Sequence, residues 1–315
     1  MPGTKIVICG SVAIDRIMNF GGKYRDLIQP DKLHVLSLSV LLDKLEDSRG
    51  GIGANIANAI AQLGEQPILI SSVGPDARSY VKDLADLGVD VSNIHYSKTH
   101  TAAFNVFTDI EHSQVGGFYP GAMLDSDAAS FKPWQGQDVL FLLSGFDPKA
   151  MNRMIEECRQ ANLRLVFDPG QQVSDDTIDL KAGVEAAEIV FLNDYEQGLL
   201  CKKTGLSPEE LKAKVPVLVT TFGKEGSIIE GSKLAEPIKI SIAKADQMID
   251  PTGAGDAYRA GFLYGYLRQW ELAKCAQLGA TVASFILERH GTQRQLSKAA
   301  IIERYRRDFN EEIEL

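Results

Sequence analysis

Short apolar segments recur along the whole chain. They are rich in Val, Ile, Leu and Phe, and they show little alternation between apolar and polar positions. Parallel strands that helices cover on both faces have this pattern, because side chains on both faces are buried. The pattern therefore predicts strands over residues 5–9, 67–73, 138–143, 163–167, 188–192 and 215–220.

Amphipathic segments with helical spacing lie between these strands and fill the last quarter of the chain. The predicted helices cover residues 54–63, 77–87, 148–161, 194–204, 254–269, 271–289 and 297–310. Strands that alternate with helices in this way predict an α/β fold, in which helices cover both faces of a mostly parallel sheet.

Two stretches, residues 15–45 and 101–120, interrupt this alternation. Both contain aromatic and β-branched residues with frequent polar residues between them, and residues 104–108 alternate in the register of a strand. We expect both stretches to form strands outside the main sheet. The prediction is a single domain over residues 1–315 with a discontinuous β-sheet lid, formed by about residues 15–45 and 100–122.

Composition and charge narrow the possible functions. The chain of 315 residues is 44% hydrophobic and 24% charged, which is typical of a globular protein and excludes a disordered or fibrous one. Its net charge of −9 and the lack of a basic cluster argue against nucleic acid or an anionic membrane as a partner. The scattered cysteines and histidines have no metal-ligand spacing. With no apolar run near about 18 residues, we expect a cytoplasmic protein.

The segment 250–256 (DPTGAGD) places very small residues at the start of a strongly helical pattern. The N–H groups that open a helix lack intrahelical acceptors, and together with the helix dipole they form an anion site. Asp256 then stands in the first turn, beside any anion that binds there. It is a candidate general base, accepting a hydroxyl proton while the amides hold a phosphoryl group. Taken alone, the segment also fits a tight turn followed by an ordinary N-terminal acid.

A second glycine-rich segment, residues 50–57 (GGIGANIA), precedes another predicted helix. Its glycines permit close approach of the backbone to a ligand, and Asn55 offers both a donor and an acceptor. The segment is not a dinucleotide fingerprint, because Ile56 stands where GxGxxG has its third glycine. The chain has no complete Walker or GxSxG motif either, which excludes several common nucleotide and hydrolase sites.

Asp15 follows the first predicted strand, beyond the edge where open α/β sheets bind ligands. A carboxylate there can accept hydrogen bonds from two adjacent hydroxyls of a ribose or another polyol. An aspartate after a strand is also a common turn residue. The residues alone leave both interpretations open.

Together, the two glycine-rich segments resemble the motifs of the ribokinase or PfkB family of carbohydrate and nucleoside kinases. Residues 50–55 resemble its N-terminal glycine motif, and residues 250–262 resemble its C-terminal DTxGAGD signature, with Pro251 in place of the commoner threonine. The resemblance spans essentially the whole chain. It implies a ribokinase-like three-layer α/β/α fold with a small β-sheet lid, and transfer of the γ-phosphoryl group of ATP to a hydroxyl.

On the acceptor side, the resemblance implies that Asp256 is the catalytic base. It also implies an anion hole at Gly253, Ala254 and Gly255. The residues that it assigns to the acceptor hydroxyls are Asp15, Gly50, Gly51 and Asn55.

On the nucleotide side, Asn193 and Glu196 resemble the NxxE element that organises Mg²⁺ through water. The loop that resembles a nucleotide-binding loop contains Thr221, Gly223 and Gly226. Asp250, with carbonyls near residues 290–293, resembles a monovalent-cation site that would take K⁺. Arg259 lies one helical turn after Asp256, where it could contact the phosphates of ATP or pair with a carboxylate.

Several segments are most similar to the prokaryotic nucleoside kinase branch of the family, among them residues 119–123, 167–171 and 250–262. This similarity implies a ribonucleoside acceptor, adenosine foremost, phosphorylated at its 5′-hydroxyl. Phe104 and Tyr119 of the lid are candidates to stack on the base, although such aromatic residues also form lid cores.

Two other functions stay open at this point. One is a ribokinase-like sugar kinase, against which Ile52 counts because ribokinases commonly carry lysine there. The other is a nucleoside-binding sensor that has lost catalysis. The family resemblance also implies a possible homodimer through the lid, since unpaired strand edges invite association.

Overall fold

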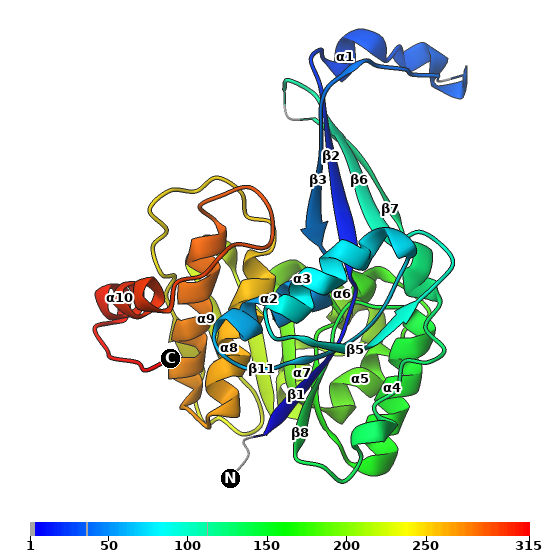
Figure 1. Ribbon diagram of the computed structural model, residues 1–315. Coiled ribbons are helices and arrows are strands. Elements are labelled where there is room, and N and C mark those ends of the chain that lie inside the picture. The colour runs from blue at the N-terminus through cyan, green and yellow to red at the C-terminus, as the bar shows by residue number, and fades with distance from the viewer. Residues whose placement is uncertain (1–3, 36, 112) are drawn as a thin grey trace.

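The computed structural model describes residues 4–35, 37–111 and 113–315. The other residues, which the predicted domain or lid includes, are Met1, Pro2, Gly3, Leu36 and His112, and they lie outside the described part. Two sheets organise the chain, a large one in the body and a small one that stands away from it (Figure 1).

The large sheet has nine strands in the order β13-β12-β11-β10-β9-β8-β1-β4-β5. Its strands are parallel except for β12, which pairs antiparallel with both β11 and β13 at one edge. The bounds are β1 (Lys5–Cys9), β4 (Ile68–Val73), β5 (Asp90–Tyr96), β8 (Val139–Leu143), β9 (Arg164–Phe167), β10 (Ala187–Asn193), β11 (Val217–Thr221), β12 (Ser227–Glu230) and β13 (Ile238–Ile240).

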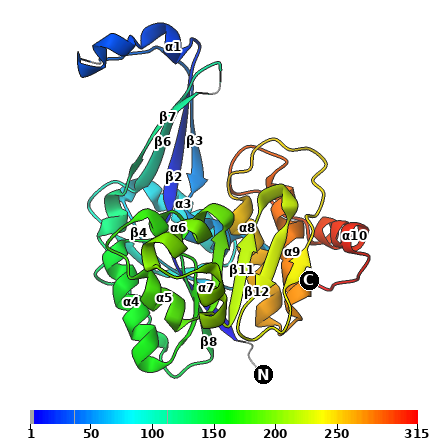
Figure 2. The ribbon, with the colours of Figure 1, turned by 180° about the vertical axis from the view of Figure 1, so that it is seen from behind.

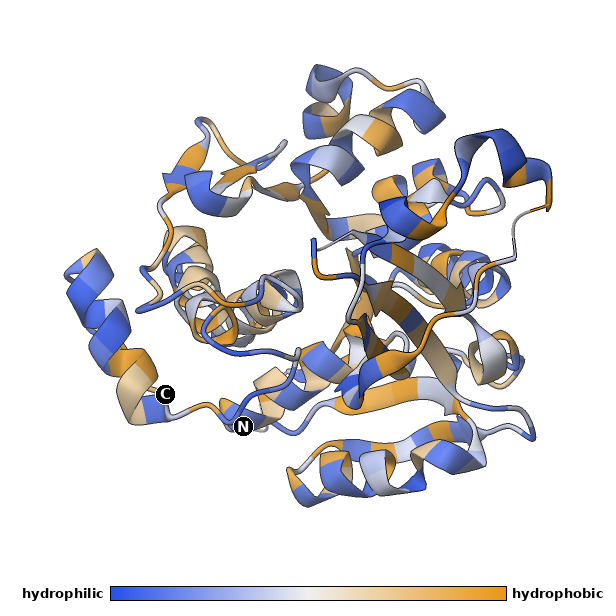
Figure 3. Cartoon of the chain, turned by 90° about the horizontal axis from the view of Figure 1, so that it is seen from above, coloured by the Kyte–Doolittle hydropathy of each residue, from blue (hydrophilic) through white to orange (hydrophobic). Residues whose placement is uncertain are grey.

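Helices cover both faces of this sheet, which makes three layers (Figures 1 and 2). On one face lie α2 (Ile52–Gln62), α3 (Arg78–Asp86), α8 (Ala254–Leu267), α9 (Leu272–Ile286) and α10 (Lys298–Phe309). On the other face lie α4 (Pro148–Ala161), α5 (Leu180–Ala186), α6 (Asp194–Thr204) and α7 (Pro208–Lys214). Apolar positions gather on the strands and on the inner sides of the helices (Figure 3).

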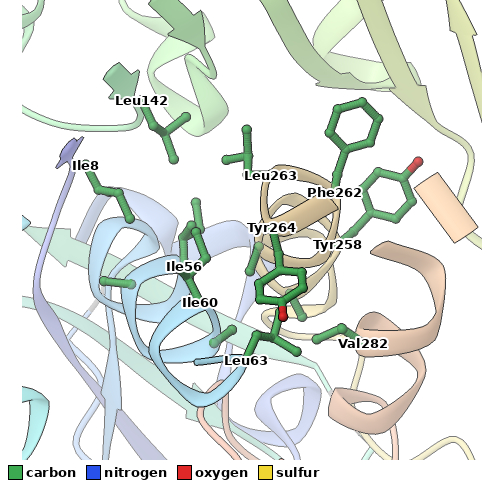
Figure 4. Packing of buried hydrophobic residues seen from close by; sticks show 14 of the residues in the cluster. Ile8, Ile56, Ile60, Leu63, Leu142, Tyr258, Phe262, Leu263, Tyr264 and Val282 are labelled. Carbon is green, nitrogen blue, oxygen red and sulfur yellow. The ribbon is translucent and has the colours of Figure 1, made fainter. Parts of the chain in front are cut away.

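Successive residues of the central strands feed the two cores in turn. In β1, Ile6 and Ile8 join one core while Val7 and Cys9 join the other. Because both kinds of position are buried, the strand sequence shows no alternation, as predicted. In the first core, Ile8 and Leu142 of the sheet lie on the side of α2 and α8 (Figure 4).

The small sheet, hereafter the lid, has the strand order β3-β2-β6-β7. Its strands are β2 (Ala13–Phe20), β3 (Leu42–Gly50), β6 (Ala102–Thr108) and β7 (Gln114–Tyr119). Two short helices, α1 (Tyr24–Leu27) and η1 (Pro30–Val35), connect β2 to β3 at the outer end of the lid (Figure 1). The stretch 15–45 is therefore not strand throughout: Gly21, Gly22 and Pro30 interrupt it, and β3 continues to Gly50.

The predicted α/β class with a mostly parallel sheet and a small second sheet is confirmed. The helices 148–161 and 194–204 have the predicted bounds. Strands β5, β12 and β13 were missing from the sequence prediction, because the edge strand β5 is largely polar and β12 and β13 are only four and three residues long. The carboxyl ends of the parallel strands form the edge of the large sheet that faces the lid (Figure 1).

Candidate active site

The carboxyl edge of the large sheet gathers polar residues that the sequence singled out, together with Asp168, which it did not. Asp168 follows β9, Asn193 ends β10 and Thr221 ends β11. Asp15 lies in β2, three residues after the turn that leaves β1. Ligands of open α/β sheets bind at this edge.

Helix α8 opens with a glycine that no other residue replaces easily. Gly253 has φ of +82°, and a Cβ there would lie 2.9 Å from the Cβ of Thr292. The amide of Ala254 donates to the carbonyl of Pro251 at 3.2 Å. The next amides, those of Gly255 and Asp256, lie in the first turn of α8. They have no intrahelical acceptor, because no carbonyl of the helix lies four residues before them. They can therefore hold an anion at the positive end of the helix. The predicted anion hole at Gly253, Ala254 and Gly255 is thus shifted by one residue in part, because the amide of Ala254 is engaged by Pro251.

Asp256 lies in this first turn and is held by Asn55 of α2. The Nδ2 atom of Asn55 donates to Oδ2 of Asp256 at 2.8 Å, across 201 positions of sequence. Burial raises the pKa of Asp256 to about 7, even though Arg259 and the bond from Asn55 act to lower it. A carboxylate with a pKa near neutrality is suited to accept a proton from a hydroxyl.

Asp15 is the second partly buried carboxyl on this side. Its carboxylate lies against Gly50, where a Cβ would overlap it, so the glycine makes room for the acid. Burial raises the pKa of Asp15 to about 6, with a further contribution from the negative charge of Asp250. Gly51 follows in the turn that enters α2, with φ of +93°.

The register of the lid sorts its aromatic residues onto two faces. Asp15 pairs with Phe104, and Phe104 pairs with Phe118, so these three side chains share one face. Tyr119 pairs with Ala103 and therefore lies on the opposite face, although the sequence analysis grouped it with Phe104. The face that carries Asp15 presents Phe104 and Phe118, both exposed.

Arg259 is buried beneath the start of α8 rather than open to a ligand. Its side chain is 9% exposed, and Nη2 donates to Oδ1 of Asp168 at 2.6 Å. Glu196 lies 3.8 Å from the same nitrogen, and Ser144 donates to the other oxygen of Asp168 at 2.7 Å. Of the two roles that the sequence allowed, the structure shows the pairing with a carboxylate. Asp168 is fully buried and was not identified from the sequence.

Asn193 and Glu196 form a capping box at the start of α6. The side chain of Asn193 accepts from the amide of Glu196 at 2.8 Å, and the carboxylate of Glu196 accepts from the amide of Asn193 at 2.8 Å. Burial raises the pKa of Glu196, while Arg259 opposes the rise. Among the described residues no three His, Cys, Asp or Glu side chains gather as a metal site. A single carboxylate of this kind fits Mg²⁺ held through water.

The loop after β11 borders an open cavity of about 520 Å³. Thr221 ends the strand, and the loop turns at Gly223 and Gly226, where the amide of Phe222 donates to the carbonyl of Gly226 at 2.8 Å. The lining residues of the cavity are Phe222, Glu225, Ser227, Ile228, Lys239, Ile240 and Ser241. The predicted nucleotide-side loop thus has space beside it.

Asp250 ties two loops together below α8. Its carboxylate accepts from the amide of Thr252 at 2.9 Å and from that of Gly291 at 3.3 Å. Burial would raise the pKa of Asp250, but these bonds hold it below its ordinary value. An ionised carboxylate between two loops fits a monovalent cation.

Comparisons with known proteins bear on the whole chain. The sequence pattern of pfkB family carbohydrate kinases matches residues 14–299. A nucleoside kinase of Methanothermobacter thermautotrophicus is 34% identical over 277 residues, which cover 85% of this chain and 87% of that protein. A Burkholderia thailandensis nucleoside kinase in complex with inosine has a TM-score of 0.85 at 30% identity, covering 98% of this chain and 100% of the other. The nucleoside kinase of Methanocaldococcus jannaschii has a TM-score of 0.83 at 29% identity, covering 96% and 98%.

Fold and comparisons together define the class as a phosphotransferase whose acceptor is an alcohol group. The chain belongs to the pfkB family of carbohydrate kinases, as its motifs predicted. No helix in residues 4–35, 37–111 and 113–315 is long and apolar enough to cross a membrane.

Proposed function

We propose that the protein is an ATP-dependent nucleoside kinase, which transfers the γ-phosphoryl group of ATP to the 5′-hydroxyl of a ribonucleoside, with adenosine preferred. The observation that carries this proposal is the pairing of Asp256 with Asn55 at the opening of α8. It places a carboxyl with a pKa of about 7 beside amides that can hold an anion. The similarity to proteins that are named nucleoside kinases supports the nucleoside as acceptor.

In the proposed reaction the chain supplies a base and an anion site. The carboxylate of Asp256 takes the proton of the acceptor hydroxyl as its oxygen bonds to the γ-phosphorus. The bond between that phosphorus and the β–γ bridging oxygen breaks, and ADP leaves with the electron pair. The amides at Gly255 and Asp256, with the positive end of α8, stabilise the charge on the transferred group.

Positioning contributes more than the base. Orientation of the two reactants supplies about 7–11 kcal/mol, whereas a general base contributes about 10²–10⁴-fold in rate. The lid also protects ATP, because water at the γ-phosphate would hydrolyse it. Closure of a lid over the acceptor keeps that water out.

The acceptor side combines a carboxylate with aromatic surface. Asp15 accepts hydrogen bonds from two ribose hydroxyls, assisted by Asn55 and the backbone at Gly50 and Gly51. The exposed rings of Phe104 and Phe118 share its face and stack on the base. Ile52 packs near Gly145 and Gly170, which puts an apolar side chain where a sugar kinase commonly has a lysine.

Two cations complete the proposed site. Glu196, whose carboxylate Asn193 fixes, would hold Mg²⁺ through water, and the cation would supply charge neutralisation of the ATP phosphates when bound. Asp250 would hold K⁺ between the loops that support α8. Thr221, Gly223 and Gly226 border the nucleotide.

Release of ADP tests the proposal, with ATP, Mg²⁺ and K⁺ and a panel of nucleosides and sugars. We expect the highest kcat/KM with adenosine, and a loss of about 10²–10⁴-fold in Asp256→Asn. A higher kcat/KM for ribose would contradict the acceptor and leave the kinase in place. Binding of nucleoside without any turnover that depends on Asp256 would identify a sensor.

We also propose that the lid forms a homodimer contact. The outer strands β3 and β7 leave unpaired edges, and the exposed apolar residues nearby include Leu41, Leu45 and Val115. Sedimentation velocity tests this. A monomer at all concentrations, or a dimer that survives the change Val115→Lys with Leu45→Lys, would contradict it.

A further inference from the structure

Thr292, in the loop between α9 and α10, connects segments that are far apart in sequence. Its hydroxyl lies 2.7 Å from the carbonyl oxygen of Arg49, near the end of lid strand β3, and 2.9 Å from Oδ1 of Asn55. The residue is 7% exposed. Its side chain also packs under Gly253 at the opening of α8.

The neighbouring Gln293 doubles this connection. Its Nε2 atom donates to Oδ1 of Asn55 at 3.1 Å and also contacts the hydroxyl of Tyr80. That hydroxyl donates to the carbonyl of Gly50 at 2.9 Å. Of the last two carbonyls of β3, that of Arg49 is held by this loop directly, and that of Gly50 is held by Tyr80 of α3, which Gln293 contacts.

These donors decide which way the amide of Asn55 points. With two donors on Oδ1, the Nδ2 atom is left to face Asp256. The reversed amide would place an oxygen against the carboxylate of Asp256, which repels it when ionised. The orientation of Asn55 is therefore fixed by two residues that are not among those assigned to the acceptor or to ATP.

We propose that Thr292 is a positioning residue that couples the seating of the lid to the orientation of Asn55, and through Asn55 to the general base Asp256. A hydroxyl has one proton, so Thr292 shares it between the carbonyl of Arg49 and Oδ1 of Asn55. A movement of the lid that shifts Arg49 changes the share that reaches Asn55. The inference rests on the proposed function for its effect on catalysis, but the coupling itself is a property of the fold.

Two substitutions separate the hydroxyl of Thr292 from its packing. Thr292→Val keeps the shape and removes the hydroxyl, whereas Thr292→Ser keeps the hydroxyl and removes the methyl group. Thr281→Val is the matched control, because it removes a buried hydroxyl whose bond at 2.8 Å stays within α9.

In steady-state kinetics we expect Thr292→Val to lower kcat about tenfold, with the KM for ATP within about twofold of wild type. The acid limb of its pH profile moves to higher pH, since a freer Asn55 lowers the pKa of Asp256 less. Thr292→Ser recovers most of the loss. The proposal is overturned if Thr292→Val has the same kcat and pH profile as Thr281→Val. It is also overturned if Thr292→Ser is as slow as Thr292→Val.

Hydrogen–deuterium exchange of the same variants does not depend on turnover. We expect faster exchange in Thr292→Val than in Thr292→Ser both at residues 46–57 and at residues 253–258. A change confined to residues 287–297 overturns the coupling. If the wild type turned over no acceptor while exchange showed the linked change, the proposed function would fail and the coupling would stand.

Discussion

Asp256 and Asp15, the two carboxyl groups that the site brings near one another, have contrasting supports. Asp256 lies in the first turn of α8, where the next nine residues are buried, and its partner Asn55 is buried as well. Asp15 lies on the four-stranded lid, where all six residues of β7 are exposed.

This difference in support shows which part of the site is fixed by the packing of the fold. The proposed base and anion site are held by core packing and by hydrogen bonds between distant segments, so we expect substitutions there to affect catalysis and folding together. The side chains on the face of the lid that carries Phe104 and Phe118 are largely exposed, so they can change with little effect on stability.

Apart from the loss of Asp256 itself, the largest effect is expected for Gly253→Ala. Alanine at a φ of +82° is strained, and its Cβ would press against Thr292, so α8 opens differently and the anion site is displaced. We expect kcat to fall about 100-fold, comparable with the loss of an oxyanion donor. The measurement is ADP release at saturating substrates.

Gly88→Ala is the matched control for this change. Gly88 has φ of +98° and open space around its Cβ position, far from the site in the α3–β5 turn. It carries the backbone strain without the contact, and we expect lower stability with unchanged kcat. If Gly253→Ala and Gly88→Ala had the same kcat, the packing around α8 would not fix the anion site, and the contrast with the lid would be lost.

The pH dependence of kcat/KM is expected to come from the buried side. Because the pKa of Asp256 is raised to about 7, the carboxylate needed as base is lost as the pH falls through that value. Activity then declines about tenfold per pH unit below about 7, and more steeply once Asp15, with a pKa of about 6, is protonated. The residual activity of Asp256→Asn is expected to lack the limb near pH 7; a limb that persists there would assign it to another group.

On the lid, Phe104→Ala is expected to raise the KM for the nucleoside about tenfold through lost stacking. The effect on kcat and on the melting temperature is small, because the ring is 40% exposed. Tyr119→Ala on the opposite face is the comparison, and we expect a smaller change in KM. A larger effect at Tyr119 than at Phe104 would mean that the other face of the lid meets the acceptor.

The smallest expected effect is a change in how the free energy of unfolding depends on pH. The folded pKa of Asp256 lies above its ordinary value, so the carboxyl contributes most to stability at low pH, and that contribution is lost as the pH rises from about 4 through 7. Asp256→Asn has no such loss. Its free energy of unfolding relative to that of wild type is therefore expected to increase by about 1–3 kcal/mol between pH 5 and pH 8. Urea unfolding at the two pH values measures it; an advantage that shrinks with pH would contradict the raised pKa.

The sequence predicted elements whose ends have local causes. Helix α4 is an example, since Asp147 caps the amide of Ala150, Pro148 occupies the first turn and Asn162 adopts the left-handed conformation at the end. Strand β3 was predicted only in part, because its polar sequence is held as a strand by pairing with β2 rather than by its own pattern.

The same distinction holds for the site. Asp256, Asn55 and Asp15 could be chosen because each stands next to a glycine motif or a strand end. Asp168 and Thr292 could not, because their roles arise from partners 91 and 237 positions away, at Arg259 and Asn55, and no local pattern records such pairs. The predicted roles of the individual site residues stay predictions until the variants are measured.

The way in which the lid is built has a consequence for how such enzymes diversify. Its parallel pairing of β2 with β6 joins segments about ninety positions apart, yet the exposed residues of its inner face belong to no core. Selection can therefore exchange these side chains one at a time without rebuilding the machinery around α8. An ancestral phosphoryl-transfer platform can in this way serve successive acceptors, with the lid as the part that evolution edits.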